Sequence, residues 1–275
     1  MEELREELIK NYFGNIAIND NFEYQKQLSK IAFTLPLNEQ LALFPLMKID
    51  DNKILLISDT HFGSIYENYM YLNLVYEFAS KYGYNVILHG GDLTQGDVSP
   101  RIDKKEKLSK QVYRVIAKYP YDKNINNYIL LGNHDHFIFR NTDNSLNILK
   151  YRDDINFLGI RCAYINWCDN LISISHRLKK GKCKIDFPRV ESLVRFHGHR
   201  HELFILESNV FIPTLSNDIN RYSDRPNYPG FLTAEISDEY LNIYSYVFND
   251  KKIVNRGLVL EKKVSERAKI KWMEY

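Results

Sequence analysis

The sequence predicts an α/β protein with a parallel sheet in its first half and antiparallel strands at its end. Between residues 53 and 131, short runs of leucine and β-branched residues alternate with helical patterns, which is typical of βαβ units. Past residue 155 the apolar runs become short and frequent, as expected for strands rather than helices. The last three runs carry the turn signals Ser237-Asp238 and Asn249-Asp250 between them, so we expect these runs to pair as antiparallel strands.

The first 50 residues are expected to be helical. Leu4, Leu8 and Tyr12 recur at helical spacing, and a second helix is expected from about residue 21 to residue 33, before Pro36. We therefore divide the chain into a helical N-terminal extension (1–50) and one larger domain (51–275). The extension could form a lid, a dimer contact or a partner-binding module, but a small packed appendage is the simplest interpretation.

The larger domain divides into strands and helices of ordinary length. Helices are expected at residues 67–82 and 103–119. Strands are expected at residues 53–58, 85–89, 127–131, 155–158, 163–166, 171–175, 194–197, 203–207, 210–213, 230–236, 240–248 and 252–260.

Composition excludes several classes of protein. Of the 275 residues, 44% are hydrophobic and 26% charged, with a formal net charge of +2, which rules out disordered and fibrous chains. No apolar run approaches the ~20 residues of a membrane-spanning helix, and the charged first residues do not resemble a signal peptide. Three cysteines without a CxxC pair argue against a disulfide framework. We expect a cytoplasmic protein with no membrane contact; its oligomeric state stays open.

The histidines are confined to the middle of the chain. All eight lie between residues 61 and 201, where five short polar motifs each follow or end a predicted strand. Because ligands bind at the carboxyl ends of strands in an open α/β sheet, these motifs can converge on one point. The motifs are Asp59-Thr60-His61, Gly90-Gly91-Asp92, Gly132-Asn133-His134-Asp135, the single His176, and Gly198-His199-Arg200-His201.

The residue types in these motifs predict a metal site. Four imidazoles, two carboxylates and one amide suit Mn, Fe, Zn or Ni better than Mg or Ca, which prefer oxygen ligands alone. Seven ligands are too many for one tetrahedral ion, but they fit two ions ~3.5–4 Å apart that share a carboxylate. Each motif alone is short enough to arise by chance, whereas all five in order at strand ends are not. The expected ligands are Asp59, His61, Asp92, Asn133, His176, His199 and His201.

Together these motifs resemble the signature of the calcineurin-like metallophosphoesterases, over roughly residues 53–260. The resemblance implies a four-layer α/β/β/α sandwich of two mixed sheets flanked by helices, with residues 51–275 as the catalytic domain. It implies two divalent ions, for which we favour Mn over Fe, Zn or Ni, and attack of a metal-bound hydroxide on phosphorus.

The resemblance also assigns roles to single residues. One ion would be held by Asp59, His61 and His201, the other by Asn133, His176 and His199, and Asp92 would bridge them. His134 would act near the leaving group as a general acid or oxyanion stabiliser, and Asp135 would support its loop.

Departures from the family pattern narrow the expected substrate. Phosphoprotein phosphatases continue the Gly-Asp motif as Gly-Asp-x-x-Asp-Arg-Gly, whereas Gln95 stands here in place of the second Asp and the Arg is missing. SbcD-like repair exonucleases usually have His at that position. We therefore expect a small phosphodiesterase acting on nucleic acid or a nucleotide. The alternatives are a phosphomonoesterase and, in another class, a binding scaffold without catalysis.

Four further residues are candidates for substrate binding, namely Gln95, Arg177, Arg200 and Arg221. Arg177 opens a run of basic residues after His176, which could attract a phosphate-rich substrate, although a solvated lysine loop is the simpler interpretation. Arg221 belongs to a long loop whose aromatic and basic residues could stack bases and hold phosphates, or could be structural. His89 and His197 are expected to be hydrogen-bonded histidines in or near strands, without a part in the site.

Overall fold

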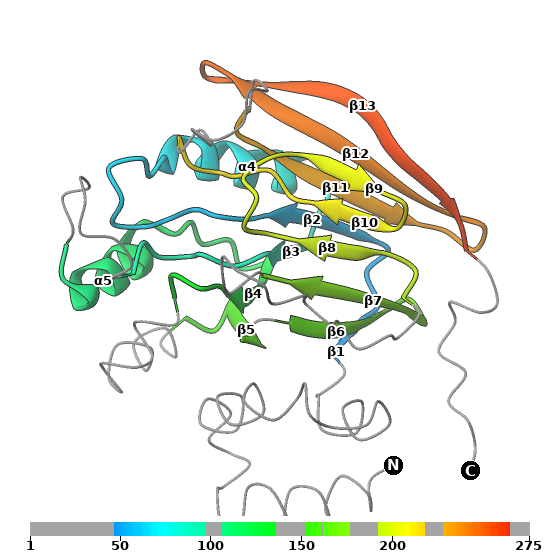
Figure 1. The fold of residues 1–275 in the computed structure, drawn as a ribbon, viewed down its shortest axis with the longest axis horizontal. Helices are drawn as coiled ribbons and strands as arrows, with labels where there is room; N and C mark the ends of the chain where they lie inside the picture. Colours follow the sequence, from blue (N-terminus) through cyan, green and yellow to red (C-terminus); the bar gives the residue numbers. More distant parts are fainter. Residues whose placement is uncertain are drawn as a thin grey trace, which may run out of the picture.

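The computed structural model describes residues 47–96, 106–135, 152–160, 162–176, 192–217 and 228–264. These residues form an α/β fold with two mixed sheets and few helices (Figure 1). The helices are α4 (Tyr69–Tyr82) and α5 (Leu108–Lys118). The expectations for residues 1–46, and for residues 103–105 at the start of the second predicted helix of the larger domain, lie outside the described residues.

The larger sheet has seven strands and combines the two patterns expected from the sequence. Strands β2 to β5 pair in parallel, and β11 joins β2 in the antiparallel sense. Strands β11, β12 and β13 pair antiparallel, which confirms the expectation for the last three runs. In spatial order the strands are β13 (Lys252–Lys263), β12 (Tyr240–Asn249), β11 (Gly230–Ile236), β2 (Lys53–Ile57), β3 (Val86–His89), β4 (Asn126–Leu131) and β5 (Ile155–Ile160).

The smaller sheet has six strands. Its order is β1 (Met47–Ile49), β6 (Cys162–Trp167), β7 (Asn170–Ser175), β8 (Arg195–His197), β10 (Asn209–Phe211) and β9 (Phe204–Leu206). Here one expectation is wrong: residues 47–49 are not helical but form β1, which pairs in parallel with β6. The helical periodicity on which that expectation depended ends well before Met47, and the pairing with β6 is a long-range contact that local spacing does not reveal.

Two apolar cores lie on the two faces of the larger sheet. Along β2, Ile54 and Leu56 face the core between the sheets, together with Trp167 of β6. Leu55 and Ile57 face the opposite core, into which α4 and α5 pack. Both faces of β2 are therefore buried, which explains why its sequence is a continuous apolar run rather than an alternating one.

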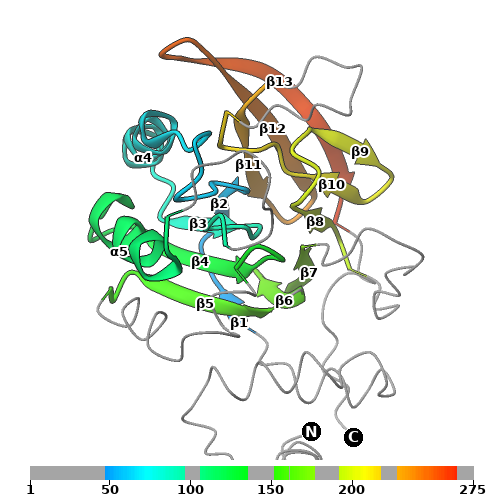
Figure 2. The same cartoon turned by 60° about the vertical axis from the view of Figure 1, so that its left-hand side comes forward.

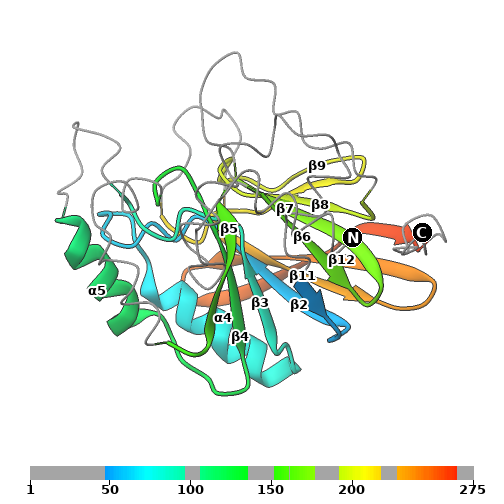
Figure 3. The same ribbon diagram turned by 90° about the horizontal axis from the view of Figure 1, so that it is seen from below.

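Helices α4 and α5 lie on the same side of the larger sheet, and the smaller sheet lies on its other side (Figures 2 and 3). The described residues thus form three layers, α/β/β, where the resemblance implied four. Every residue of β6 and β7 is nevertheless buried. Ile165 and Trp167 face the core between the sheets, so Tyr164 and Asn166 are buried on the other face of the smaller sheet.

Helix α4 begins and ends with standard caps. The side chain of Asn68 accepts a hydrogen bond from the backbone N–H of Tyr71, and Gly83 ends the helix in the left-handed conformation at φ +72°. Neither described helix has the length and apolar character needed to cross a membrane.

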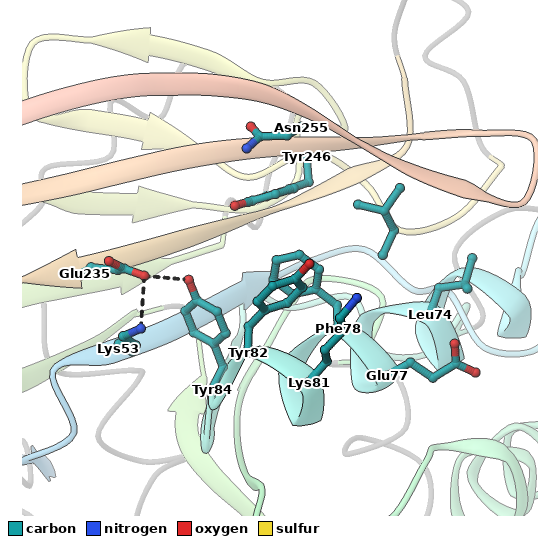
Figure 4. Close-up of a pocket in the computed structure, with 11 residues that line it drawn as sticks. Lys53, Leu74, Glu77, Phe78, Lys81, Tyr82, Tyr84, Glu235, Tyr246 and Asn255 are labelled. Atoms are coloured by element: carbon teal, nitrogen blue, oxygen red, sulfur yellow. Dashed lines mark hydrogen bonds and ion pairs between the residues drawn. The ribbon is translucent and has the colours of Figure 1, made fainter.

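A hollow of about 550 Å³ lies between α4 and strands β12 and β13 (Figure 4). Phe78 and Tyr246 form an apolar part of its wall. On one side Glu235 accepts a hydrogen bond from the Tyr84 hydroxyl and forms an ion pair with Lys53. The polar groups at this end are therefore paired with one another, and no residue of the five polar motifs lines the hollow.

Candidate metal centre

The loops that follow β2 and β3 run side by side beyond the ends of their strands. The backbone N–H of Asp59 donates to the carbonyl of Gly91 at 2.9 Å, and that of His61 donates to the carbonyl of Asp92 at 3.0 Å. The N–H of Phe62 continues this pattern with the carbonyl of Leu93 at 2.9 Å. Ladder-like hydrogen bonds therefore bring the first two polar motifs together.

Five of the expected ligands have a backbone conformation that is uncommon for residues other than glycine. Positive φ angles are unfavourable for most side chains and cluster at functional sites. The residues are Asp59 (φ 55°), His61 (φ 48°), Asp92 (φ 54°), His199 (φ 78°) and His201 (φ 61°).

One group of potential ligands consists of Asp59, His61 and His201, whose ligand atoms lie within 4.8 Å of one another. Oδ1 of Asp59 is 3.2 Å from Nε2 of His201 and 3.8 Å from Nε2 of His61. The two Nε2 atoms are 3.2 Å apart. The other carboxylate oxygen of Asp59 accepts hydrogen bonds from the Ser58 hydroxyl at 2.5 Å and the His199 N–H at 3.0 Å. These contacts fix the carboxylate with Oδ1 toward the histidines.

A second group consists of Asp92, His176 and His199, again with ligand atoms within 4.8 Å of one another. Oδ2 of Asp92 is 3.0 Å from Nε2 of His176, yet neither atom has a hydrogen-bond partner. The same Oδ2 is 4.0 Å from Nε2 of His61 in the first group. Asp92 thus lies between the two groups, as expected for a carboxylate shared by two ions.

Several atoms of the site are buried without a hydrogen-bond partner, although such atoms are rare in proteins and costly. They are Oδ1 of Asp59, Nδ1 of His61, Oδ2 of Asp92, Oδ1 of Asn133 and Nε2 of His176. Carboxylate oxygens, an amide oxygen and imidazole nitrogens are all metal ligands, so the residues present fit divalent ions. The His and Asp clusters indicate a dinuclear metal site.

Burial and neighbouring charges set the protonation states of these residues. Burial lowers the pKa of His61 to about 3 and that of His199 to about 4. Burial would also lower the pKa of His176, but the charges of Asp92 and Asp59 and the hydrogen bond to the Gly90 carbonyl together outweigh burial and raise this pKa to about 9. Burial would raise the pKa values of Asp59 and Asp92, but neighbouring histidines hold both below the usual range of a carboxyl group. Both carboxylates are therefore anionic at neutral pH, and His61 and His199 are neutral.

His134 lies beside the second group with one ring nitrogen fixed by the backbone. The backbone N–H of His134 donates a hydrogen bond to Oδ1 of Asp92 at 2.9 Å. In its ring, Nδ1 is 2.7 Å from the carbonyl oxygen of Gln95. Since a carbonyl only accepts, Nδ1 carries the proton. Nε2 is then 3.8 Å from Oδ2 of Asp92. The ligand atoms of His61, Asp92 and His134 also lie within 4.8 Å of one another, so His134 is close enough to act on a group bound there.

Asp135 is buried, and both of its carboxylate oxygens are used within the loops. Oδ1 accepts hydrogen bonds from the N–H and the hydroxyl of Thr94, each at 2.8 Å. Oδ2 accepts from the N–H groups of Leu93 at 3.0 Å and Gly132 at 2.9 Å. Asp135 therefore ties the loop after β4 to the loop after β3. Its contacts are those of a residue that supports the loop of His134.

The sequence matches one protein family. Residues 52–254 match the family model Metallophos, which is described as calcineurin-like phosphoesterase. This chain belongs to the calcineurin-like phosphoesterase family. With its buried His and Asp cluster, it has the features of a metal-dependent phosphoesterase.

No curated protein matches the sequence. Similar solved structures include Vps29 from Entamoeba histolytica with Zn²⁺, at 14% identity and a TM-score of 0.45, covering 77% of this chain and 98% of that one. YfcE, a phosphoesterase from E. coli, has 16% identity and a TM-score of 0.45, with 75% and 98% covered. The nuclease MPE from Pseudomonas putida has 14% identity and a TM-score of 0.33, with 74% and 86% covered. At such values we rest the family assignment on the family model alone.

Other expectations for this phosphoesterase have mixed outcomes. Arg177 and Arg221 lie outside the described residues. The guanidinium of Arg200 lies over the rings of Phe204 at 5.1 Å and Phe211 at 5.0 Å, which gives no support to a role in substrate binding. Gln95 contacts the site through its carbonyl oxygen, where the sequence had suggested its side chain.

The two histidines that were expected to be structural are confirmed as such. His89 lies in β3, where Nδ1 accepts a hydrogen bond from the Gly91 N–H at 3.1 Å and Nε2 is 3.1 Å from the Thr60 hydroxyl. His197 lies in β8 and contacts the Ser175 hydroxyl at 2.7 Å.

The sequence did not reveal the residues that hold the ligands in place. Ser58 precedes Asp59 directly and fixes its carboxylate, but a single serine at a strand end carries no signal of that role. The glycines that precede the ligands did indicate close packing in the site. A Cβ atom on Gly132 would overlap Asp92, and one on Gly91 would come within 2.5 Å of His176.

Proposed function

We propose that this chain is a dinuclear metal-dependent phosphoesterase that hydrolyses phosphodiesters. One observation carries the proposal: Oδ1 of Asp59, Oδ2 of Asp92 and Nε2 of His176 are buried, close together and without hydrogen-bond partners. Two divalent cations would satisfy buried polar atoms with this arrangement.

We assign the ligands as the resemblance implied. Asp59, His61 and His201 would hold one ion, and Asn133, His176 and His199 would hold the other, with Asp92 shared between them. Each assignment is supported by the two groups of ligand atoms, and that of Asn133 by its buried Oδ1 without a partner. The mixture of oxygen and nitrogen ligands supports Mn as the ion, with Fe, Zn and Ni as alternatives.

His134 and the loop that holds it would supply a proton to the leaving group. When bound, the two ions supply activated water and neutralise charge on the phosphoryl oxygens. His134 holds its Nδ1 proton against the Gln95 carbonyl, so its Nε2 faces the centre. A protonated Nε2 can donate to the leaving oxygen or to a phosphoryl oxygen. Asp135 binds the loop of His134 to the loop that carries Asp92 through hydrogen bonds to both.

The preference for diesters is supported by the sequence around Asp92. A phosphoprotein phosphatase would have Asp in place of Gln95 and an Arg directly after it, and this chain has neither. A phosphomonoesterase is the second candidate, and a binding scaffold is third because the ligand set and His134 are all present.

Three further expectations remain proposals. The division into residues 1–50 and 51–275 is supported by the family match, which begins at residue 52, whereas the pairing of β1 with β6 places residues 47–49 with the larger domain. A fourth layer is supported by the buried outer face of β6 and β7, which α4 and α5 do not cover. A cytoplasmic location is supported by the two described cysteines, Cys162 and Cys168, which are free thiols.

The test is hydrolysis of bis-p-nitrophenyl phosphate beside p-nitrophenyl phosphate. The protein is stripped with a chelator, reloaded with Mn²⁺ and assayed with its metal content known. We expect faster turnover of the diester, lost on stripping and recovered on reloading. Faster turnover of the monoester would move the phosphomonoesterase to first place. No turnover of either ester by protein with two bound ions would favour the scaffold.

A further inference from the structure

The side chain of Gln111, on the first turn of α5, is fully buried, and both ends of its amide are hydrogen-bonded. Oε1 accepts a hydrogen bond from the backbone N–H of Gly96 at 2.8 Å. Nε2 donates to the carbonyl of Gly96 at 3.2 Å and to the carbonyl of Glu106 at 2.9 Å. The amide therefore binds both polar groups of a single residue in the loop after β3.

We infer that Gln111 is a positioning residue for His134, an inference that rests on the proposed function of the site. Gly96 directly follows Gln95, whose carbonyl oxygen lies 2.7 Å from Nδ1 of His134. Holding both the N–H and the carbonyl of Gly96 fixes the direction of the Gln95–Gly96 peptide. That direction decides whether His134 finds its acceptor, and so where the imidazole points.

Gln111 also packs against the other loop of the site. A Cβ atom on Gly63 would lie 2.5 Å from Cγ of Gln111, so the side chain fits directly against the bare backbone two residues after His61. Gln95 in turn donates its N–H to the carbonyl of Phe62 at 2.9 Å. Gln111 therefore contacts both loops between which the peptide of residue 95 is held.

The chemistry of this contact requires an amide. The backbone of Gly96 presents one donor and one acceptor. Its partner must therefore supply one acceptor and one donor on a side chain of the same length. Methionine has nearly the same length but supplies neither, and it would leave the buried N–H of Gly96 without a partner. Glutamate would keep the acceptor but would direct an anionic oxygen at the carbonyls of Gly96 and Glu106. The residue is thus chosen for its hydrogen bonds and not only for its volume.

The site around Gly96 is tight, so small movements reach His134. A Cβ atom on Gly96 would overlap the backbone carbonyl oxygen of His134, and φ of Gly96 is +65°. The loop after β3 and the loop after β4 are therefore in direct contact at this residue. Freeing Gly96 from Gln111 would shift the backbone of both.

The test compares Gln111→Met with Val115→Ala, both on α5. Val115 is buried in the core beside the larger sheet, so its truncation loosens the helix without removing a hydrogen bond from the loops. We expect Gln111→Met to keep its bound metal and its KM but to lose kcat by about 10-fold or more, part of the 10²–10⁴-fold that a positioned acid contributes. Val115→Ala should lower the melting temperature while kcat stays within about 2-fold of the wild type.

A double-mutant cycle separates positioning from general damage. If Gln111 acts through His134, Gln111→Met should lower kcat by less than about 2-fold when His134 is already alanine. An equal loss in both backgrounds would overturn the inference. So would a parallel loss of metal and activity in Gln111→Met, because Gln111 would then support the metal centre as a whole.

A spectroscopic measurement tests the inference without depending on catalysis. In Zn-loaded protein labelled with ¹⁵N-histidine, the wild type should show a protonated Nδ1 on His134, assigned from its absence in His134→Ala. We expect this signal to move or vanish in Gln111→Met and to persist in Val115→Ala. An unchanged Nδ1 signal in Gln111→Met would contradict the positioning role. This result does not depend on hydrolysis of any ester, so it can be told apart from a failure of the proposed function.

Discussion

Nδ1 of His176 lies 2.7 Å from the carbonyl oxygen of Gly90, while its Nε2 lies 3.0 Å from Oδ2 of Asp92. The Gly90 carbonyl can only accept, so it holds a proton on Nδ1 and turns Nε2 toward the carboxylate. Gly90 and Asp92 belong to the same loop. One loop therefore orients the histidine from β7 and supplies the carboxylate it meets, which is how proteins commonly fix an imidazole for metal binding.

This arrangement predicts that Gly91→Ala impairs the metal centre. A Cβ atom at this position would lie 2.5 Å from Nδ1 of His176, and φ of Gly91 is +107°. The imidazole would have to leave the Gly90 carbonyl, so we expect weaker binding of the ion assigned to His176. Metal content after dialysis against a limiting concentration of Mn²⁺ measures the effect.

Gly257→Ala is the matched control. Gly257 also has a positive φ, of +93°, but a Cβ atom there would meet no other atom within 4 Å. Both variants carry the backbone strain of a non-glycine residue at positive φ, roughly 1–2 kcal/mol. Only Gly91→Ala should lose metal. Equal metal retention in both would show that His176 tolerates the added methyl group.

Exchange of the bridging carboxylate should separate metal binding from turnover. Asp92→Asn removes the charge shared by both groups of ligands, so we expect metal content to fall from about two ions per chain to one or fewer.

His134→Ala should keep both ions and lose turnover by about 10²–10⁴-fold. Elemental analysis and hydrolysis of bis-p-nitrophenyl phosphate measure the two effects. Asp92→Asn with two tightly bound ions would contradict the bridging role, and full activity of His134→Ala would contradict the role of that histidine.

Much of this site could be predicted from the sequence because its ligands lie in short motifs at strand ends. Apolar runs such as residues 53–57 mark the strands, and the parallel pairing of β2, β3 and β4 places their polar endings at one edge. The Asp-x-His spacing then places Asp59 and His61 in one group, whereas the two histidines of His-x-His belong to different groups. This information is local, so a single sequence contains it.

The supporting contacts could not be predicted, since they pass through backbone groups that every residue has. The Gln95 carbonyl would accept from His134 whatever the side chain of residue 95, and sequence reasoning therefore looked to that side chain. Gln111 lies 15 residues from Gly96 on a helix whose apolar face gave no hint of a buried amide. Strand β1 depends on its pairing with β6, more than 100 residues away.

Metal removal should lower the thermal stability of the protein. Asp59 and Asp92 are buried with an oxygen each that has no hydrogen-bond partner, and cations that satisfy these oxygens bind only the folded chain. At a free metal concentration 100 times Kd, such binding contributes about 2.7 kcal/mol to the free energy of unfolding. For a chain of this size the melting temperature should then rise by about 5 °C or more. Thermal melts with EDTA and with Mn²⁺ measure this rise in melting temperature. Coincident melts would contradict a preformed metal site. The difference between the two melting temperatures should be smaller in Asp92→Asn.

Removing one partner of a buried ion pair away from the site should destabilise the protein far more than removing one partner of an exposed pair. Nε and Nη2 of Arg152 bind the two carboxylate oxygens of Asp154 at 2.6 Å and 2.7 Å, and the guanidinium also donates to the carbonyls of Tyr119 and Pro120 just after α5. Arg152→Met would leave the buried Asp154 carboxylate without its cation, so we expect a loss of about 3 kcal/mol in the free energy of unfolding. Lys48→Met, which breaks an exposed pair with Asp50 at 2.9 Å, should cause no measurable change. Urea unfolding of both variants measures the difference; equal midpoints would mean that Arg152 does not hold the end of α5 to β5.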